Sequence, residues 1–146
     1  MVAKIVQITD KLFISDYITE ELFAELEHLG ITAIVNLSLK DDYYPPSKIR
    51  YLHVGFPDGA YIPHNKLKEI YEFIRKEKKR GKVLVHCLAG VSRSAGVLIG
   101  QLMIDNPNWS WNEAFNFVRD KKWIMPAHRI KESILDFITD KRKIND

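Results

Sequence analysis

The sequence predicts an α/β fold in which a mostly parallel central sheet is flanked by helices. Three observations lead to this fold class. Short β-branched segments alternate with helical segments in the first half, a nearly continuous apolar strand covers Lys82–His86, and only helical patterns follow it. Strands that alternate with helices are typical of parallel sheets, and a strand that is apolar along its length is buried on both faces.

The first half of the chain contains most of the expected strands. Leu22, Leu26 and Leu29 recur at helical spacing, and Gly30 follows them as a helix terminator. The paired prolines at 45 and 46 and the Pro-Asp-Gly sequence at 57–59 mark loops. We expect strands at 2–8, 12–15, 31–39 and 51–56, and helices at 19–29 and 64–80, the second of which is closed by Gly81.

The second half is helical after its one strand. Ser110 and Glu113 have the spacing of a capping box, in which each side chain bonds the backbone of the other at the start of a helix. We expect helices at 94–104, 110–121 and 127–141. No internal repeat or linker divides the chain, so we expect a single domain over residues 1–146.

Length and composition are those of an ordinary globular domain. Of the 146 residues, 46% are hydrophobic and 28% are charged, and the net charge is +3. These values exclude a disordered or collagen-like chain, and the charge is far below that of a dedicated nucleic-acid-binding protein. A single cysteine excludes an intramolecular disulfide and a cysteine-based zinc cage. Because no apolar stretch is long enough to span a membrane, we expect a cytoplasmic protein.

The segment that carries chemistry is the sequence HCLAGVSRS at 86–94. It leaves the buried strand and enters a helix, and a loop in that position can direct successive backbone N–H groups at an anion. Gly90 allows the necessary curl, and the guanidinium of Arg93 can grip two oxygens of a phosphate-like group at once. We therefore expect an anion-binding loop made of Leu88, Ala89, Gly90, Val91, Ser92 and the Arg93 side chain.

Cys87 lies at the mouth of this expected loop. The loop amides, the helix dipole and Arg93 all favour a thiolate over a thiol, so the features that bind an oxyanion also create a nucleophile that faces it. Most free cysteines are small buried hydrophobes. The arginine six residues further on, with a glycine between, favours the catalytic interpretation for this one.

The segment 86–94 resembles the His-Cys-x-x-Gly-x-x-Arg-Ser/Thr signature of the cysteine-dependent protein phosphatases, and the short chain is similar to their compact dual-specificity and protein tyrosine phosphatase branch. The resemblance extends from about residue 11 to residue 138. It implies that Cys87 attacks phosphorus and carries the phosphoryl group, while Arg93 and the loop amides stabilise the equatorial oxygens without a metal. It also implies that His86 orients the loop through hydrogen bonds.

Two further catalytic residues are expected. Ser94 is placed to donate its hydroxyl to the sulfur of Cys87, although a serine there also serves as a helix cap. Asp58 is the expected general acid, which protonates the leaving group and later accepts a proton from the attacking water. We expect its strand to neighbour the strand that ends at Cys87, although Pro-Asp-Gly is also a common turn sequence. Asp41 and Asp42 are the next candidates for this acid.

The chain departs from the family pattern in its last helix. The family often has Pro-Asn-x-Gly-Phe there, and the asparagine braces the phosphate loop, whereas Ala127 follows Pro126 in this chain. An alanine side chain has no hydrogen-bonding group. We expect the brace to be absent or to come from elsewhere, with His128 as a candidate.

The resulting prediction is metal-independent hydrolysis of phosphate monoesters on proteins, with phosphotyrosine favoured and phosphoserine or phosphothreonine left open. The five residues before Arg93 include no lysine, which argues against inositol polyphosphates. Two alternatives remain open, a rhodanese-type sulfurtransferase and a non-catalytic phosphoprotein-binding module. Tyr43 and Tyr44 are candidates for a wall of the pocket. We expect a phosphorylated protein or peptide as the partner, no nucleic-acid or membrane partner, no cofactor and a monomer.

Overall fold

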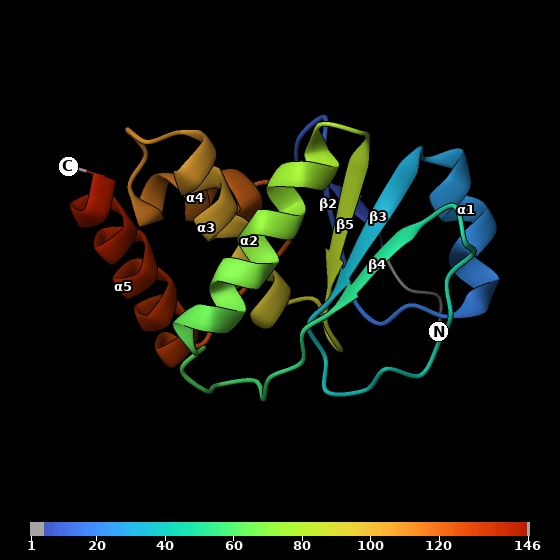
Figure 1. Cartoon of the computed structure of the whole chain (residues 1–146), viewed down its shortest axis with the longest axis horizontal. Helices are drawn as coiled ribbons and strands as arrows, with labels where there is room; N and C mark the ends of the chain where they lie inside the picture. Colours follow the sequence, from blue (N-terminus) through green and yellow to red (C-terminus); the bar gives the residue numbers. More distant parts are fainter. Residues whose placement is uncertain (1–4, 146) are drawn as a thin grey trace.

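A computed structural model of the chain describes residues 5–145. Its centre is a five-stranded sheet with the strand order β1-β2-β5-β3-β4 (Figure 1). β1 (Val6–Gln7) pairs in the antiparallel sense with β2 (Leu12–Ser15), and all other neighbouring strands are parallel. The remaining strands of the sheet are β5 (Lys82–His86), β3 (Ile31–Asn36) and β4 (Arg50–His53). The expected mostly parallel sheet is confirmed.

Helices cover both faces of the sheet (Figure 1). One face carries a single turn of 3-10 helix, η1 (Glu20–Leu22), followed by α1 (Phe23–His28). The other face carries four helices, which are α2 (His64–Lys78), α3 (Arg93–Asp105), α4 (Trp111–Arg119) and α5 (His128–Asn145). The predicted sheet with flanking helices is therefore present, with unequal layers on its two sides.

The side chains of β5 account for these two layers. Val83 and Val85 pack into the larger core with α2 and its neighbouring helices, whereas Leu84 packs into the smaller core beside α1. All three side chains are fully buried. The strand is apolar along its length because both of its faces are covered, as the sequence predicts.

Two strands end earlier than expected because the chain turns at the carboxyl-terminal edge of the sheet. The strand expected at 31–39 stops at Asn36, whose side-chain oxygen accepts a hydrogen bond from the Ser38 N–H at 2.9 Å. The strand expected at 51–56 stops at His53. Beyond it, the Phe56 N–H donates to the Leu37 carbonyl at 3.4 Å, so the chain folds back over the end of β3.

The remaining boundaries differ by smaller amounts. The segment expected as one helix at 19–29 begins as 3-10 helix and continues as α1. Of the strand expected at 2–8, only Val6–Gln7 form β1, and residues 2–4 lie outside the described part of the chain. The predicted capping box of Ser110 and Glu113 is present at the start of α4.

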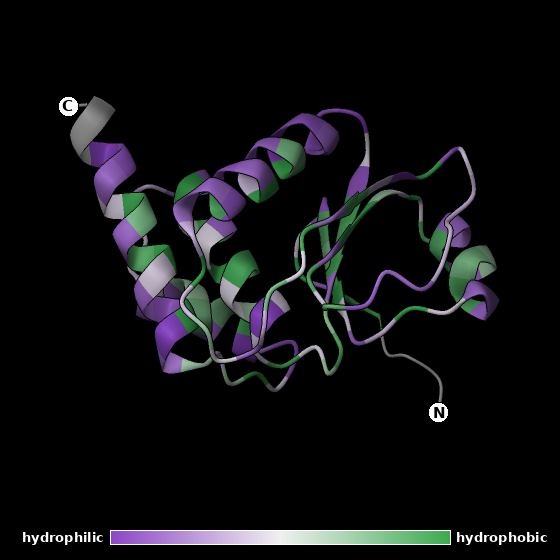
Figure 2. Ribbon diagram, turned by 60° about the horizontal axis from the view of Figure 1, so that its bottom comes forward, coloured by the Kyte–Doolittle hydropathy of each residue, from purple (hydrophilic) through white to green (hydrophobic). Residues whose placement is uncertain are grey.

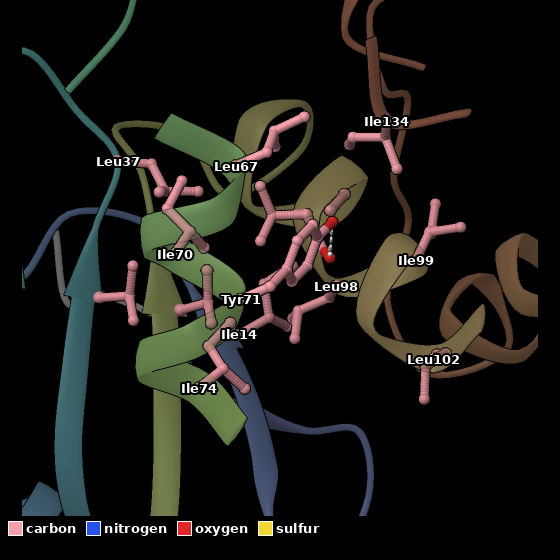
Figure 3. Close-up of a cluster of buried hydrophobic side chains, with 14 of the residues drawn as sticks. Ile14, Leu37, Leu67, Ile70, Tyr71, Ile74, Leu98, Ile99, Leu102 and Ile134 are labelled. Carbon is pink, nitrogen blue, oxygen red and sulfur yellow. Dashed lines mark hydrogen bonds between the residues drawn. The ribbon is translucent and has the colours of Figure 1, made fainter. Parts of the chain in front are cut away.

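The larger core fixes α3 between α2 and α5 (Figure 3). The hydroxyl of Tyr71 in α2 donates to the carbonyl of Val97 in α3 at 2.9 Å, the dashed contact in Figure 3. A Cβ atom at Gly100 would lie only 2.1 Å from the same hydroxyl, so glycine is what lets the two helices approach this closely. α3 is buried from its first residue through Met103, and this packing holds its N-terminus at the end of β5.

Candidate active site

The loop between β5 and α3 curls around the sulfur of Cys87. The Gly90 N–H donates to Sγ at 3.3 Å, and the hydroxyl oxygen of Ser94 lies 3.2 Å from the same atom. α3 begins at Arg93, so the positive end of its dipole is part of the same loop. An amide N–H, a hydroxyl and a helix N-terminus therefore surround the sulfur.

Gly90 is required by both its conformation and its surroundings. Its φ of +70° lies in the left-handed region that side chains other than glycine rarely adopt. A Cβ atom there would lie 2.9 Å from both the Asp16 nitrogen and the Ser15 oxygen. The Tyr17 N–H also donates to the Leu88 carbonyl at 3.1 Å, so the loop rests on the segment that follows β2.

Arg93 is charged but only 8% exposed. Its Nη1 donates to the Phe56 carbonyl at 3.0 Å. A guanidinium has several N–H donors in a fixed fork, so one contact can hold the side chain while others bind a phosphate oxygen. The arginine therefore joins the phosphate loop to the segment that contains Asp58.

Asp58 lies in a turn two residues after Phe56, and its side chain is exposed. One part of the prediction is wrong, because the strand before it does not neighbour the strand that ends at Cys87. β3 lies between β4 and β5 in the sheet. The hydrogen bond from Arg93 to Phe56 spans this separation and brings the turn back towards the phosphate loop.

The alternative acids lie in the loop after β3. Asp41 accepts a hydrogen bond from the Tyr51 hydroxyl at 2.5 Å and lies 3.8 Å from Nδ1 of His53. Burial, with this hydrogen bond as the next cause, raises the pKa of Tyr51 to about 12. Asp41 thus accepts a structural hydrogen bond, whereas Asp42, like Asp58, is exposed. Asp58 stays the predicted acid, because its turn follows the Phe56 carbonyl that Arg93 binds.

His86 is buried at the end of β5, where Tyr43 holds its ring. Nδ1 lies 3.3 Å from the carbonyl oxygen of Cys87, and Nε2 lies 2.7 Å from the Tyr43 hydroxyl. A carbonyl can only accept, so Nδ1 carries the hydrogen and Nε2 accepts from the tyrosine. Burial lowers the pKa of His86 to about 4 and raises that of Tyr43. The ring is therefore neutral near pH 7 and can orient the first peptide group of the loop.

Sequence reasoning missed this role of Tyr43. The residue was a candidate for a pocket wall, but it is only 4% exposed and packs against His86 and Tyr51. Its neighbour Tyr44 is the exposed one of the pair. Tyr43 lies in an irregular loop without hydrophobic periodicity, so no pattern in the sequence marks which of the two tyrosines turns inward.

Backbone groups from the segment before α5 brace the phosphate loop in place of an asparagine. The Ala127 N–H donates to Oγ of Ser92 at 3.0 Å, and the Met125 N–H donates to the Val91 carbonyl at 2.8 Å. His128, the candidate replacement, is instead exposed and lies 3.8 Å from Glu132. The side-chain oxygen that accepts in this brace belongs to Ser92 of the loop itself. The segment before α5 supplies only backbone N–H groups, so position 127 needs no hydrogen-bonding side chain.

The described part of the chain contains no group of three or more His, Cys, Asp or Glu side chains that could hold a metal ion. Within residues 5–145, no helix combines the length and apolar character needed to cross a bilayer.

Comparisons with known proteins identify a family. The model of the dual specificity phosphatase catalytic domain matches residues 12–140. Mouse dual specificity protein phosphatase 14 is 32% identical over 123 residues, which are 81% of this chain and 60% of that protein. Human dual specificity protein phosphatase 16 is 35% identical over 130 residues, which are 84% of this chain and 18% of that protein. The chain therefore spans less than two thirds of the length of these relatives.

Solved structures share the fold. A human tyrosine phosphatase-like serine/threonine/tyrosine-interacting protein matches with a TM-score of 0.81 at 24% identity, covering 94% of this chain and 97% of that one. A mutant form of Tk-PTP matches with a TM-score of 0.80 at 26% identity, covering 97% of each chain. The match of the family model over residues 12–140 establishes that the chain belongs to the dual specificity phosphatase catalytic domain family.

Proposed function

We propose that the chain hydrolyses phosphate monoesters on proteins through a cysteinyl-phosphate intermediate, with phosphotyrosine as the favoured substrate. The observation that carries this proposal is the setting of the Cys87 sulfur. It is bonded by the Gly90 N–H and the Ser94 hydroxyl at the start of α3, beside Arg93. Membership of the dual specificity phosphatase family supports the same activity.

In the first step, the thiolate of Cys87 attacks phosphorus. A sulfur–phosphorus bond forms, and the bond between phosphorus and the leaving oxygen breaks. Arg93 and the loop amides bind the equatorial oxygens as charge develops on them. Asp58 donates its proton to the leaving oxygen, so the product departs as a neutral alcohol.

In the second step, Asp58 as a carboxylate accepts a proton from a water molecule, which attacks the phosphorus of the intermediate. The phosphorus–sulfur bond breaks, inorganic phosphate forms and the sulfur leaves as a thiolate. The Ser94 hydroxyl, 3.2 Å from the Cys87 sulfur, donates to that thiolate as it forms. This hydrogen bond lowers the barrier of the second step more than that of the first.

The chemistry of the loop favours a simple monoester. Residues 88–92 contain no lysine, so Arg93 is the one cationic side chain that the loop sequence offers a bound phosphate. A highly phosphorylated head group needs more positive charge than this. The tyrosine phenol, with an ordinary pKa of about 10, is also a better leaving group than a serine or threonine alkoxide.

The Cys87→Ser substitution tests the proposal. A hydroxyl in place of the thiolate should lower kcat by at least about 1,000-fold, because the nucleophile is lost while the loop that binds phosphate remains. The measurement is hydrolysis of a phosphotyrosine peptide by both proteins in the presence of a chelator, together with vanadate binding. Substantial residual turnover in the variant would contradict the assignment. Sulfur transfer from thiosulfate by the wild type, without phosphatase activity, would favour the sulfurtransferase alternative.

A further inference from the structure

The exposed large hydrophobic side chains of the described chain come from the loop after Cys87 and from segments that bond to it. Their exposed fractions run from 55% to 86%. A single exposed hydrophobic residue is ordinary, but a gathered set marks an interaction surface. The set, called here the apolar collar, consists of Leu39, Tyr44, Leu88, Trp123 and Met125.

Part of the collar belongs to the phosphate loop and to the segment that braces it. Leu88 directly follows Cys87 in the loop. Met125 donates its backbone N–H to the Val91 carbonyl of the loop at 2.8 Å, and Trp123 lies two residues before it. Leu88 and Met125 are therefore held by the same backbone that surrounds the sulfur, and the ring centroid of Trp123 lies 5.5 Å from Cζ of Arg119 in α4.

The rest of the collar lies in the loop after β3. The Leu37 N–H donates to the His86 carbonyl at 2.9 Å, and Leu39 follows two residues later. Tyr44 follows Tyr43, whose hydroxyl lies 2.7 Å from Nε2 of His86. Every collar residue is thus in the phosphate loop or within two residues of a group that bonds to segment 86–92. Figure 2 looks onto the loops at this end of the molecule.

We propose that the apolar collar binds hydrophobic side chains that flank the phosphorylated residue of a protein substrate, and so selects phosphopeptides with apolar flanks. This inference rests on the proposed phosphatase function. A peptide whose phosphate reaches Cys87 must pass over the collar, because the collar is continuous with the loop that binds the phosphate. Neighbouring residues of an extended peptide follow at about 3.3 Å each, so positions within about three residues of the phosphate lie over it.

Charge on the side of the collar formed by the loop after β3 favours a peptide over a lipid surface. That loop and the turn before α2 place Asp41, Asp42 and Asp58 on the surface, against Lys40 and Lys48 as the cations of the loop. On the other side of the collar, Arg119, Lys121 and Lys122 lie beside Trp123. Anionic membranes are bound by clustered lysines and arginines, and exposed carboxylates repel them. On that side the same carboxylates repel acidic residues next to the phosphate, which favours apolar flanks there.

Two phosphotyrosine peptides of equal length and net charge test the proposal. One carries leucine and phenylalanine within three residues of the phosphotyrosine, and the other carries serine and glycine at those positions. We expect the wild-type kcat/KM to be about tenfold higher for the apolar peptide, because each contact removes a hydrophobic side chain partly from water. Equal values for the two peptides would overturn the proposal.

Variants locate the effect on the collar. Trp123→Ser and Tyr44→Ser should each lower the ratio of the two kcat/KM values at least threefold, whereas Trp123→Phe should keep most of it. Lys122→Ala and Lys40→Ala, which change side chains beside the collar, serve as matched controls and should leave the ratio at its wild-type value. A ratio unchanged in both serine variants would also overturn the proposal.

The outcomes separate this inference from the function on which it rests. If the wild type hydrolyses neither peptide nor p-nitrophenyl phosphate, the proposed phosphatase function fails. If it hydrolyses both peptides at the same rate, only the inference about the collar fails. Faster hydrolysis of a phosphoinositide in phosphatidylcholine vesicles than of the apolar peptide would assign the collar to a lipid surface and reject the peptide.

Discussion

Two buried side chains beside Cys87 have opposite electrostatic roles. Burial lowers the pKa of His86 to about 4, so the ring is neutral at the end of β5 and adds no charge beside the sulfur. Arg93, also buried, remains charged and is held by the Phe56 carbonyl. Of these two side chains, only Arg93 therefore contributes positive charge beside the loop.

The Asp58→Ala substitution should reduce kcat according to the leaving group. Hydrolysis of an alkyl phosphate, whose leaving group needs protonation, should fall by about 100-fold or more, and hydrolysis of p-nitrophenyl phosphate should fall much less. Steady-state kinetics on a series of leaving groups measures the effect. The matched control is Asp42→Ala, which removes an exposed carboxylate from the loop after β3. Equal losses in the two variants would remove Asp58 from the role of acid.

At the scale of single residues, the sequence predicts which groups of segment 86–94 meet, but it does not predict the residues elsewhere in the chain that contact them. The spacing from Cys87 to Ser94 and the glycine between them foretell which atoms meet at the sulfur, because all lie within one strand-to-helix junction. Tyr43 and Phe56 reach the site from elsewhere in the sheet. Their contacts depend on where two irregular loops return to the sheet edge, and local pattern carries no information about that.

Among the structural elements, the segment before α5 has an unusual relation to the phosphate loop. The Ser92 hydroxyl accepts the Ala127 N–H, and the Val91 carbonyl accepts the Met125 N–H. The loop thus supplies the acceptors and the segment supplies backbone donors. A side-chain brace in the last helix is unnecessary, which explains how an alanine is accommodated there.

The Ser92→Ala substitution should weaken this brace. The Ala127 N–H loses its partner, which should lower the free energy of unfolding by about 1 kcal/mol and kcat by about tenfold, because the loop is less firmly held. Ser110→Ala is the control. It removes the cap of α4, at a similar cost of about 1 kcal/mol, and should leave kcat unchanged. Urea denaturation and steady-state kinetics on both variants decide the matter, and a matching loss of kcat in the control would contradict the role of the brace.

Elements with strong local signals are predicted well. The capping box of Ser110 and the apolar strand Lys82–His86 both occur where the sequence places them. The order of the strands is harder to predict, since hydrophobic pattern does not say which strand lies beside which. In this sheet β3 lies between β4 and β5. The turn that contains Asp58 is therefore linked to the loop after Cys87 by the hydrogen bond from Arg93 to Phe56, and not through a neighbouring strand.

At the scale of the whole molecule, the free energy of unfolding depends on pH through the buried neutral ring of His86. An unfolded histidine takes up a proton below about pH 6.5, whereas folded His86 does so only near pH 4. Between these values the unfolded state binds more protons than the folded state. The stability that neutral His86 contributes is therefore present above about pH 6.5 and is lost as the pH falls towards 4.

We expect the free energy of unfolding to fall by up to about 3 kcal/mol on this account between pH 7 and pH 4. Urea denaturation across this range measures it. His86→Gln should show a smaller decrease than the wild type, whereas His128→Gln, in an exposed side chain of α5, should follow the wild type. If wild type and His86→Gln lose the same stability on acidification, the buried neutral ring is not responsible.

Parallel strands explain why the loops around Cys87 meet at one edge of the molecule. The carboxyl ends of β2, β5 and β3 lie together, and the loops that leave them carry Tyr17, Cys87 and Leu37 to the same edge. This gathering is predictable once the sheet is recognised as parallel. The exposure of the collar residues cannot be predicted in this way, because it depends on tertiary contacts.

The most direct test of the central claim is to trap the phosphoryl group on the protein. In a Ser94→Ala variant, release of the Cys87 thiolate is slowed, so mixing with p-nitrophenyl phosphate and quenching with acid should leave one phosphoryl group on the peptide that contains Cys87. Mass spectrometry detects it, and a burst of p-nitrophenol equal to the enzyme concentration should accompany it. Linear product release with an unmodified Cys87, or a phosphoryl group on a different residue, would contradict the account.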